Sequence, residues 1–155
     1  MSALAAALNA ALDESREHSK EEVRILIADD NETVRKLLCD VLRSHPAYDV
    51  ACESLTAGDA INKAEELQPH VVVLDISLPN AYGIEVISQI KTVAPFTEIL
   101  ICSQHELEDM ARAGLAAGAR GYVLKSDAVK ELVPAINAIT HGEQYTSPAM
   151  LFTKP

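Results

Sequence analysis

Between residues 23 and 142, the chain alternates between two patterns of hydrophobic positions. Short continuous apolar runs are typical of strands buried on both faces of a parallel sheet, and they occur here at Ile25–Ala28, Val71–Leu74, Ile99–Cys102 and Tyr122–Leu124. The stretches between them place apolar residues at i, i+3, i+4 and i+7, which is the pattern of a helix packed on one face. Strands that alternate with helices predict a parallel sheet covered on both sides.

A further strand has a different pattern. Tyr48, Val50 and Cys52 alternate with polar or small residues, so we expect this strand at an edge of the sheet. Asn31 and Thr56 are suitable first residues for the helices that follow the first and second strands. The inward-facing helical positions lie within Val34–Leu42, Ala57–Leu67, Ile84–Ala94, Leu107–Leu115 and Val129–Ile139.

The two ends of the chain lack this regularity. Residues 1–22 combine Leu4, Leu8 and Leu12 among alanines with a charged run. They predict either a solvated helical or flexible extension, or a short helix that packs on its own domain or on a second copy. Residues 143–155 show no periodicity and are interpreted as a C-terminal tail or linker stump. We therefore divide the chain into this extension, one domain over residues 23–142, and the tail.

Composition narrows the class of protein. The net charge of −10 over 155 residues disfavours binding of nucleic acid or of anionic membranes by this chain. No apolar run reaches the ~18 residues of a membrane span, and residues 3–12 lack the basic residues of a signal peptide. Cys39, Cys52 and Cys102 have no metal-binding or disulfide spacing, so we expect free thiols in a reducing, cytoplasmic compartment.

Polar residues follow four of the five predicted strands. Asp29 and Asp30 come after the first strand, Asp75 after the third, Ser103 ends the fourth, and Lys125 follows the fifth. The carboxyl ends of parallel strands meet at one edge of the sheet, where open α/β sheets bind their ligands. We therefore expect three carboxylates, one hydroxyl and one ammonium to converge in a single crevice.

Three adjacent carboxylates repel one another unless a cation neutralises them. Oxygen ligands and a need for positive charge suit Mg²⁺. A metal ion, a lysine and a hydroxyl group together would hold the oxygens of a phosphoryl group, whose transfer depends mainly on positioning and charge stabilisation. The residues thus predict a Mg²⁺-dependent site in which an aspartate is the phosphoryl acceptor.

The same segments carry a family resemblance over residues 23–142. The chain resembles a response-regulator receiver domain of two-component signalling, on the basis of Leu26–Asp30, Val73–Pro79 with Gly83, Cys102–Ser103, and Gly121–Lys125. Residues 142–148 are similar to the linker junction of the NarL/FixJ-type branch. The implied fold is the flavodoxin-like (βα)5 three-layer sandwich, with a parallel five-stranded sheet of order 2-1-3-4-5.

The resemblance also implies a role for each site residue. Asp75 would accept a phosphoryl group from a sensor histidine kinase or a phosphotransfer protein. Mg²⁺ would be bound by Asp29 through water, by Asp30 and Asp75 directly, and by the backbone carbonyl of Ser77. Lys125 and Ser103 would contact the phosphoryl oxygens. The rotamer of Tyr122 would report the accompanying movement of Ser103. The protein would promote only its own phosphorylation and dephosphorylation.

Several alternatives stay open on the sequence alone. Gln104 stands where the family usually has a small residue, and it could crowd the phosphoryl entrance or position a water molecule. A phosphatase of the haloacid-dehalogenase type is a remote alternative, because the acid/base carboxylate it needs two positions after Asp75 is replaced by Ser77. The chain could also be the receiver half of a truncated DNA-binding regulator, or a stand-alone receiver that acts by protein contact, with a homodimer as a further option.

Overall fold

A parallel sheet of six strands forms the centre of the molecule, and the computed structural model describes residues 3–8, 22–78, 82–105 and 108–148. The strand order is β2-β1-β3-β4-β5-β6, so the predicted order of the first five strands is confirmed. The alternating strand β2 lies at one edge, as its pattern predicted. The strands are β1 (Val23–Ala28), β2 (Tyr48–Ser54), β3 (Val71–Leu74), β4 (Glu98–Ser103), β5 (Gly121–Leu124) and β6 (Tyr145–Thr146).

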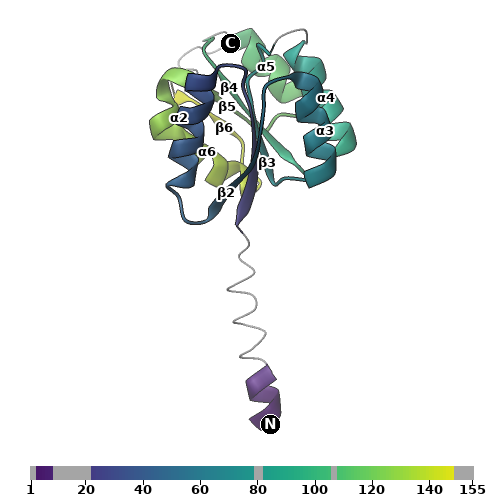
Figure 1. Ribbon diagram of the computed structural model, residues 1–155, viewed down its shortest axis with the longest axis vertical. Coiled ribbons are helices and arrows are strands. Elements are labelled where there is room, and N and C mark those ends of the chain that lie inside the picture. The colour runs from purple at the N-terminus through teal and green to yellow at the C-terminus, as the bar shows by residue number, and fades with distance from the viewer. Residues whose placement is uncertain (1–2, 9–21, 79–81, 106–107, 149–155) are drawn as a thin grey trace.

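Helices cover both faces of this sheet and complete the flavodoxin-like three-layer fold (Figure 1). One face is covered by α2 (Glu32–Arg43) and α6 (Ala128–Thr140). The other is covered by α3 (Ala57–Leu67), α4 (Gly83–Val93) and α5 (Glu108–Ala117). A short 3-10 turn, η1 (Lys125–Asp127), connects β5 to α6.

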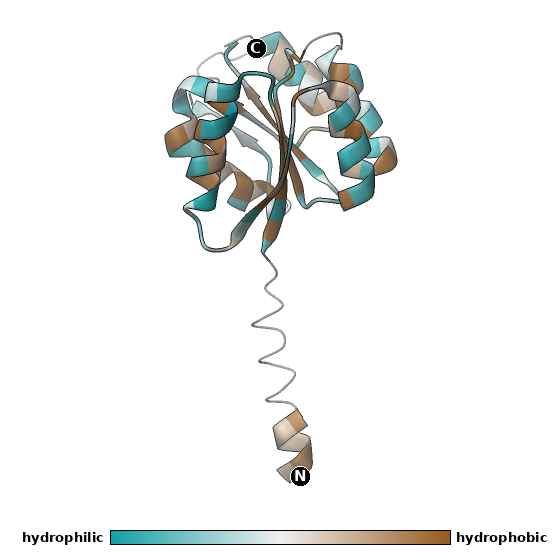
Figure 2. Cartoon of the chain, viewed as in Figure 1, coloured by the Kyte–Doolittle hydropathy of each residue, from teal (hydrophilic) through white to brown (hydrophobic). Residues whose placement is uncertain are grey.

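The continuous apolar runs divide their side chains between the two layers. In β1, Leu26 and Ala28 belong to the core beneath α3, α4 and α5, whereas Ile25 and Ile27 belong to the core beneath α2 and α6. All four of these side chains are fully buried. Figure 2 shows mainly hydrophobic central strands between helices that mix hydrophilic and hydrophobic residues. An uninterrupted apolar strand is thus required because both of its faces are covered.

The predicted helix starts are confirmed by their capping hydrogen bonds. The Asn31 side chain accepts a hydrogen bond from the backbone N–H of Val34 at 3.0 Å. The Thr56 hydroxyl accepts one from the N–H of Asp59 at 3.1 Å. Each contact satisfies a backbone donor that the first helical turn leaves without an intrahelical partner. These caps fix where the chain turns from a strand end into the next helix.

The sixth strand is a correction to the predicted five-stranded sheet. Tyr145 and Thr146, placed by the sequence in an irregular tail, pair in parallel with Gly121 and Tyr122 of β5. The Tyr145 hydroxyl also donates to the Glu131 carboxylate on α6 at 3.1 Å. Two residues are too few to show a periodicity, so the strand is specified by these tertiary contacts. Residues 149–155 of the predicted tail lie outside the described part of the chain.

The N-terminal extension is described only at residues 3–8, which are helical. Leu4 and Leu8 are exposed there, at 79% and 60% of their surface. The predictions for Leu12, for the charged run as far as residue 21, for Pro79 and for Leu107 concern residues that the structure does not describe. Among the described helices, no helix combines the length and the hydrophobicity that crossing a bilayer requires.

Candidate functional site

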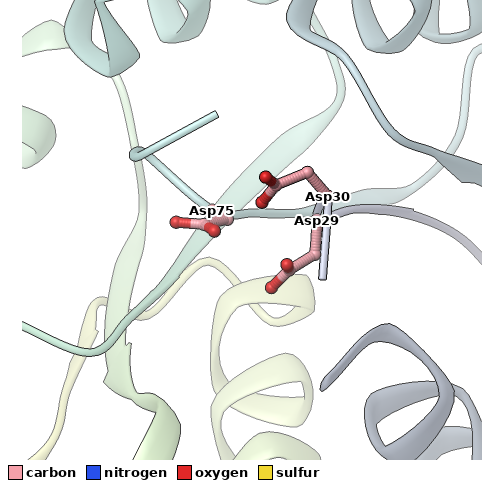
Figure 3. Close-up of side chains that lie close together, drawn as sticks. All are labelled: Asp29, Asp30 and Asp75. Carbon is pink, nitrogen blue, oxygen red and sulfur yellow. The ribbon is translucent and has the colours of Figure 1, made fainter. Parts of the chain in front are cut away.

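Three carboxylates converge where two neighbouring strands end (Figure 3). Asp29 and Asp30 follow β1, and Asp75 follows β3, which pairs with β1 in parallel. One oxygen from each carboxylate lies within 4.8 Å of the others. Asp29 and Asp75 are buried, at 1% and 3% exposure, whereas Asp30 faces solvent. The predicted convergence of the strand ends therefore places these acids together.

Lys125 supplies the positive charge at this cluster. Its Nζ lies 2.8 Å from Oδ2 of Asp29 and 3.0 Å from Oδ2 of Asp75. Burial by itself disfavours the ammonium form, but pairing with the carboxylates of Asp29 and then Asp75 outweighs this effect and raises the pKa of Lys125. The ammonium group therefore stays charged between the two buried carboxylates.

The remaining oxygens of the buried acids are held by the loops that follow them. Oδ1 of Asp75 accepts hydrogen bonds from the Ser77 hydroxyl at 2.6 Å and from the Ser77 backbone N–H at 2.9 Å. Oδ1 of Asp29 accepts one from the Asn31 N–H at 2.9 Å. The Ser77 side-chain contact was not predicted from the sequence, which assigned only a backbone role to this residue. The feature of the sequence that could have indicated this hydrogen bond is a residue with a side-chain hydroxyl two positions after Asp75.

Ser103 completes the set from the end of β4, which pairs with both β3 and β5. Its side chain is fully buried, and its Oγ accepts a hydrogen bond from the His105 N–H at 3.1 Å. The Tyr122 hydroxyl donates to the His105 carbonyl at 2.8 Å. Burial raises the pKa of Tyr122, although its contact with Ser103 opposes that change. The hydroxyl proton of Ser103 is not used in the contact with His105.

Two neighbours of Ser103 bear on the chemistry. The Cys102 thiol is buried, and burial raises its pKa to about 12, so it remains a protonated core side chain at neutral pH. Gln104 faces solvent. The sequence left open whether Gln104 crowds the entrance or positions a water molecule, and its exposed position is compatible with either role.

The donor set fits a hard divalent cation. Three carboxylates face one ammonium, so the cluster carries an excess of negative charge. Oδ2 of Asp29 is buried and contacts Lys125 as an ion pair, yet no hydrogen-bond donor with suitable geometry satisfies it in the described residues. Oxygen-only ligands, with one exposed carboxylate beside two buried ones, match the preference of Mg²⁺ for a few carboxylates and several waters.

Comparison with known proteins agrees with this arrangement. Residues 25–137 match the sequence model of the response regulator receiver domain, and the chain belongs to that family. It is 33% identical over 125 residues to the uncharacterized transcriptional regulatory protein YxjL of Bacillus subtilis, covering 81% of this chain and 57% of YxjL. It is 32% identical over 117 residues to the chemotaxis protein CheY of Thermotoga maritima, covering 76% of this chain and 97% of CheY.

A solved structure shows the same fold. The two-component response regulator of the LuxR family from Aurantimonas sp. SI85-9A1 superposes with a TM-score of 0.79 at 37% identity, covering 82% of this chain and 91% of that one. The predicted resemblance to receiver domains of the NarL type is thereby confirmed. The chain spans little more than half the length of YxjL. As a receiver domain of two-component signalling, the chain has the fold of a phosphorylation-dependent switch.

Proposed function

We propose that Asp75 accepts a phosphoryl group from the phosphohistidine of a sensor histidine kinase or a phosphotransfer protein. One oxygen of the Asp75 carboxylate attacks phosphorus, the P–N bond breaks, and the electron pair stays on the imidazole nitrogen of the donor. Asp29, Asp30, Asp75 and the carbonyl of Ser77 would hold Mg²⁺, which neutralises charge on the phosphoryl oxygens when bound. The product is an aspartyl phosphate on this chain.

The single observation that carries the proposal is the position of Lys125. Its ammonium lies between two buried carboxylates, at 2.8 Å from Asp29 and 3.0 Å from Asp75. When Asp75 is phosphorylated, its carboxylate charge is replaced by that of the phosphoryl group, and Lys125 pairs with the phosphoryl oxygens instead. The cation thus stabilises the charge that develops during transfer.

Ser103 and α5 are the parts of the domain that respond. The hydroxyl of Ser103 would donate its proton to a phosphoryl oxygen while its oxygen still accepts from the His105 N–H. The described part of α5 buries only Ala111 and Gly114, so little apolar contact opposes its movement. Tyr122 is already buried in this structure, so the change from this state falls on Ser103, Lys125 and the surface of α5, where a partner would bind.

Intact-mass measurement after incubation with acetyl phosphate and Mg²⁺ tests this function. We expect the mass of one phosphoryl group to be added to the wild-type chain, and none to the Asp75→Asn variant or to wild type in excess EDTA. Asp40→Asn is the matched control, because Asp40 is an exposed carboxylate on α2, outside the site. A wild-type chain that gains no phosphoryl mass from acetyl phosphate and also none from a phosphorylated histidine kinase would overturn the proposal. We expect no turnover of a general phosphate ester.

A second candidate is the receiver half of a DNA-binding transcriptional regulator. The observation that favours it is the match to YxjL, which is named as a transcriptional regulatory protein and of which the chain covers 57%. The gene sequence downstream of the Pro155 codon tests this candidate directly. A stop codon at that point would leave a stand-alone receiver that acts by contact with another protein or a second copy.

A further inference from the structure

Ser147 is a buried polar residue outside the phosphoryl site. It follows β6 directly and has 0% exposure. Its backbone N–H donates to the carbonyl of Tyr122 at 2.9 Å. Its hydroxyl oxygen accepts a hydrogen bond from the N–H of Leu124 at 3.0 Å. Ser147 therefore contacts β5 on both sides of Val123, and one of its partners is the residue immediately before Lys125.

The hydroxyl continues the sheet where β6 itself has ended. Thr146 is the last residue of β6 and pairs with Tyr122. Beyond that pair, the side chain of Ser147 takes the place of a backbone carbonyl as acceptor for the Leu124 N–H. A buried backbone donor without a partner is costly. The hydroxyl therefore fixes the end of β5 at the point where the chain leaves the strand and begins η1.

The end of β5 determines where the Lys125 side chain starts. Lys125 is the first residue of η1, and its Nζ must reach Asp29 at 2.8 Å and Asp75 at 3.0 Å. A lysine side chain has a long flexible stem, so the geometry of its ammonium depends on a fixed backbone. A displacement of about 1 Å at a supporting residue can reduce a reaction about a hundredfold.

We propose that Ser147 is a positioning residue for Lys125 and that it couples the C-terminal segment to the phosphoryl site. This inference rests on the proposed function of Asp75 and Lys125. Coupling between two sites is reciprocal. A phosphoryl group held by Lys125 should therefore strengthen the contact between Leu124 and Ser147, and loss of that contact should weaken the hold of Lys125 on a phosphoryl group.

Binding of a phosphoryl mimic tests the coupling. The probe is beryllofluoride, prepared from beryllium chloride and sodium fluoride in the presence of Mg²⁺, and binding to the full chain is measured by titration. We expect Ser147→Ala to bind beryllofluoride at least fivefold more weakly than wild type, and Ser147→Thr, which keeps the hydroxyl, to remain within about twofold of it. Binding of Mg²⁺ alone should not weaken in Ser147→Ala, because Lys125 is not a metal ligand.

Thr97→Val is the matched control for the loss of a buried hydroxyl. Thr97 is buried, and its hydroxyl donates to the Pro69 carbonyl at 2.7 Å. It lies just before β4, at the end of the sheet opposite the site. Thr97→Val should reduce stability as Ser147→Ala does, without weakening beryllofluoride binding. Equal weakening in both variants would show a purely structural role for Ser147 and overturn the inference.

The other outcomes separate the two proposals. If wild type binds beryllofluoride and Ser147→Ala binds it equally well, the coupling is wrong while the proposed function stands. If wild type does not bind it in Mg²⁺, both fail.

Should Ser147→Ala not fold, hydrogen exchange in wild type decides. Beryllofluoride should slow exchange of the Leu124 amide at least threefold more than that of the Glu98 amide, which bonds to the His70 carbonyl at the opposite end of the sheet. Equal changes at both amides would contradict the coupling.

Discussion

The hydroxyl of Tyr122 donates a hydrogen bond to the backbone carbonyl of His105 across 2.8 Å. The side chain that donates it belongs to β5, whereas the carbonyl belongs to the loop after β4. The same His105 residue donates its N–H to the Ser103 hydroxyl. One peptide segment therefore connects the buried tyrosine to the hydroxyl that is proposed to contact the phosphoryl group.

Tyr122→Phe should destabilise the protein by about 1 kcal/mol, because the substitution removes one hydrogen bond and leaves the ring in place. The free energy of unfolding in urea measures this loss. Tyr82→Phe is the matched control, since Tyr82 is 78% exposed, and it should leave that free energy unchanged. An equal effect of the two substitutions would contradict a contribution from the contact with His105.

Asp30→Asn should change two properties of the acidic cluster in opposite directions: it should raise the stability of the metal-free protein and weaken the binding of Mg²⁺. Without metal, we expect a gain of a few tenths of a kcal/mol in the free energy of unfolding, because one of three neighbouring carboxylates is neutralised. Mg²⁺ at about ten times its dissociation constant should stabilise wild type by about 1.4 kcal/mol. In Asp30→Asn, the same Mg²⁺ concentration should stabilise less. Thermal unfolding with and without Mg²⁺ measures both effects, and an undiminished Mg²⁺ response in the variant would argue against Asp30 as a ligand.

Two glycines should respond to alanine in opposite directions. A Cβ at Gly83, where α4 begins, would lie 2.5 Å from both Cβ and the carbonyl oxygen of Ile76. Because backbone atoms cannot move aside easily, we expect Gly83→Ala to cost about 2–3 kcal/mol. A Cβ at Gly58 in α3 meets nothing within 4 Å, so Gly58→Ala should stabilise by about 0.5–1 kcal/mol through helix propensity. Urea unfolding of both variants checks the signs.

Tyr145 should make stability sensitive to alkaline pH. Burial, followed by the hydrogen bond to Glu131, raises the pKa of Tyr145 to about 12, above the ordinary value of about 10 for tyrosine. The native state therefore holds this proton more tightly than the unfolded state does. The resulting stabilisation is complete below about pH 10 and is lost as the pH rises towards 12.

Urea unfolding at about pH 8 and about pH 11 measures this contribution. At about pH 8 the tyrosine is protonated in both states, whereas about pH 11 lies between the pKa of the unfolded state and that of the folded state. Wild type should lose more free energy of unfolding between the two pH values than Tyr145→Phe does. The other groups that titrate in this range remain in both proteins and cancel in the comparison. Equal losses would mean that the contact between Tyr145 and Glu131 does not influence ionisation.

The layout of the sheet and most of the site could be predicted from the sequence. The run Val71–Leu74 is apolar at every position because β3 is buried on both faces, and Asp75 then marks the end of that strand. Parallel strands bring their ends together, so the meeting of Asp29, Asp75 and Lys125 follows from the pattern alone. The Asn31 cap was predictable for a similar reason, because a short polar side chain at a helix start satisfies a local backbone donor.

The parts that the sequence did not predict depend on contacts without a periodic signal. The side-chain hydrogen bond from Ser77 to Asp75 depends on the local course of the loop. Strand β6 is two residues long, and only the tertiary contacts of Tyr145 and Ser147 distinguish it from an irregular tail. The hydrogen bond from the Tyr122 hydroxyl to the carbonyl of His105, which lies in the loop after β4, likewise has no periodic signal in the sequence.

Gly121 lets β6 lie close to β5. A Cβ at this position would lie 2.7 Å from Cδ1 of Leu100 and 3.1 Å from the carbonyl oxygen of Tyr145. A larger residue would therefore displace the end of the Leu100 side chain and press on the backbone of β6 next to Ser147, whose hydroxyl accepts from Leu124. The close approach of β6 at this edge of the sheet thus depends on a residue without a side chain on the strand that carries Tyr122, and exchanging Gly121 would disturb this edge while leaving every residue of the acidic cluster unchanged.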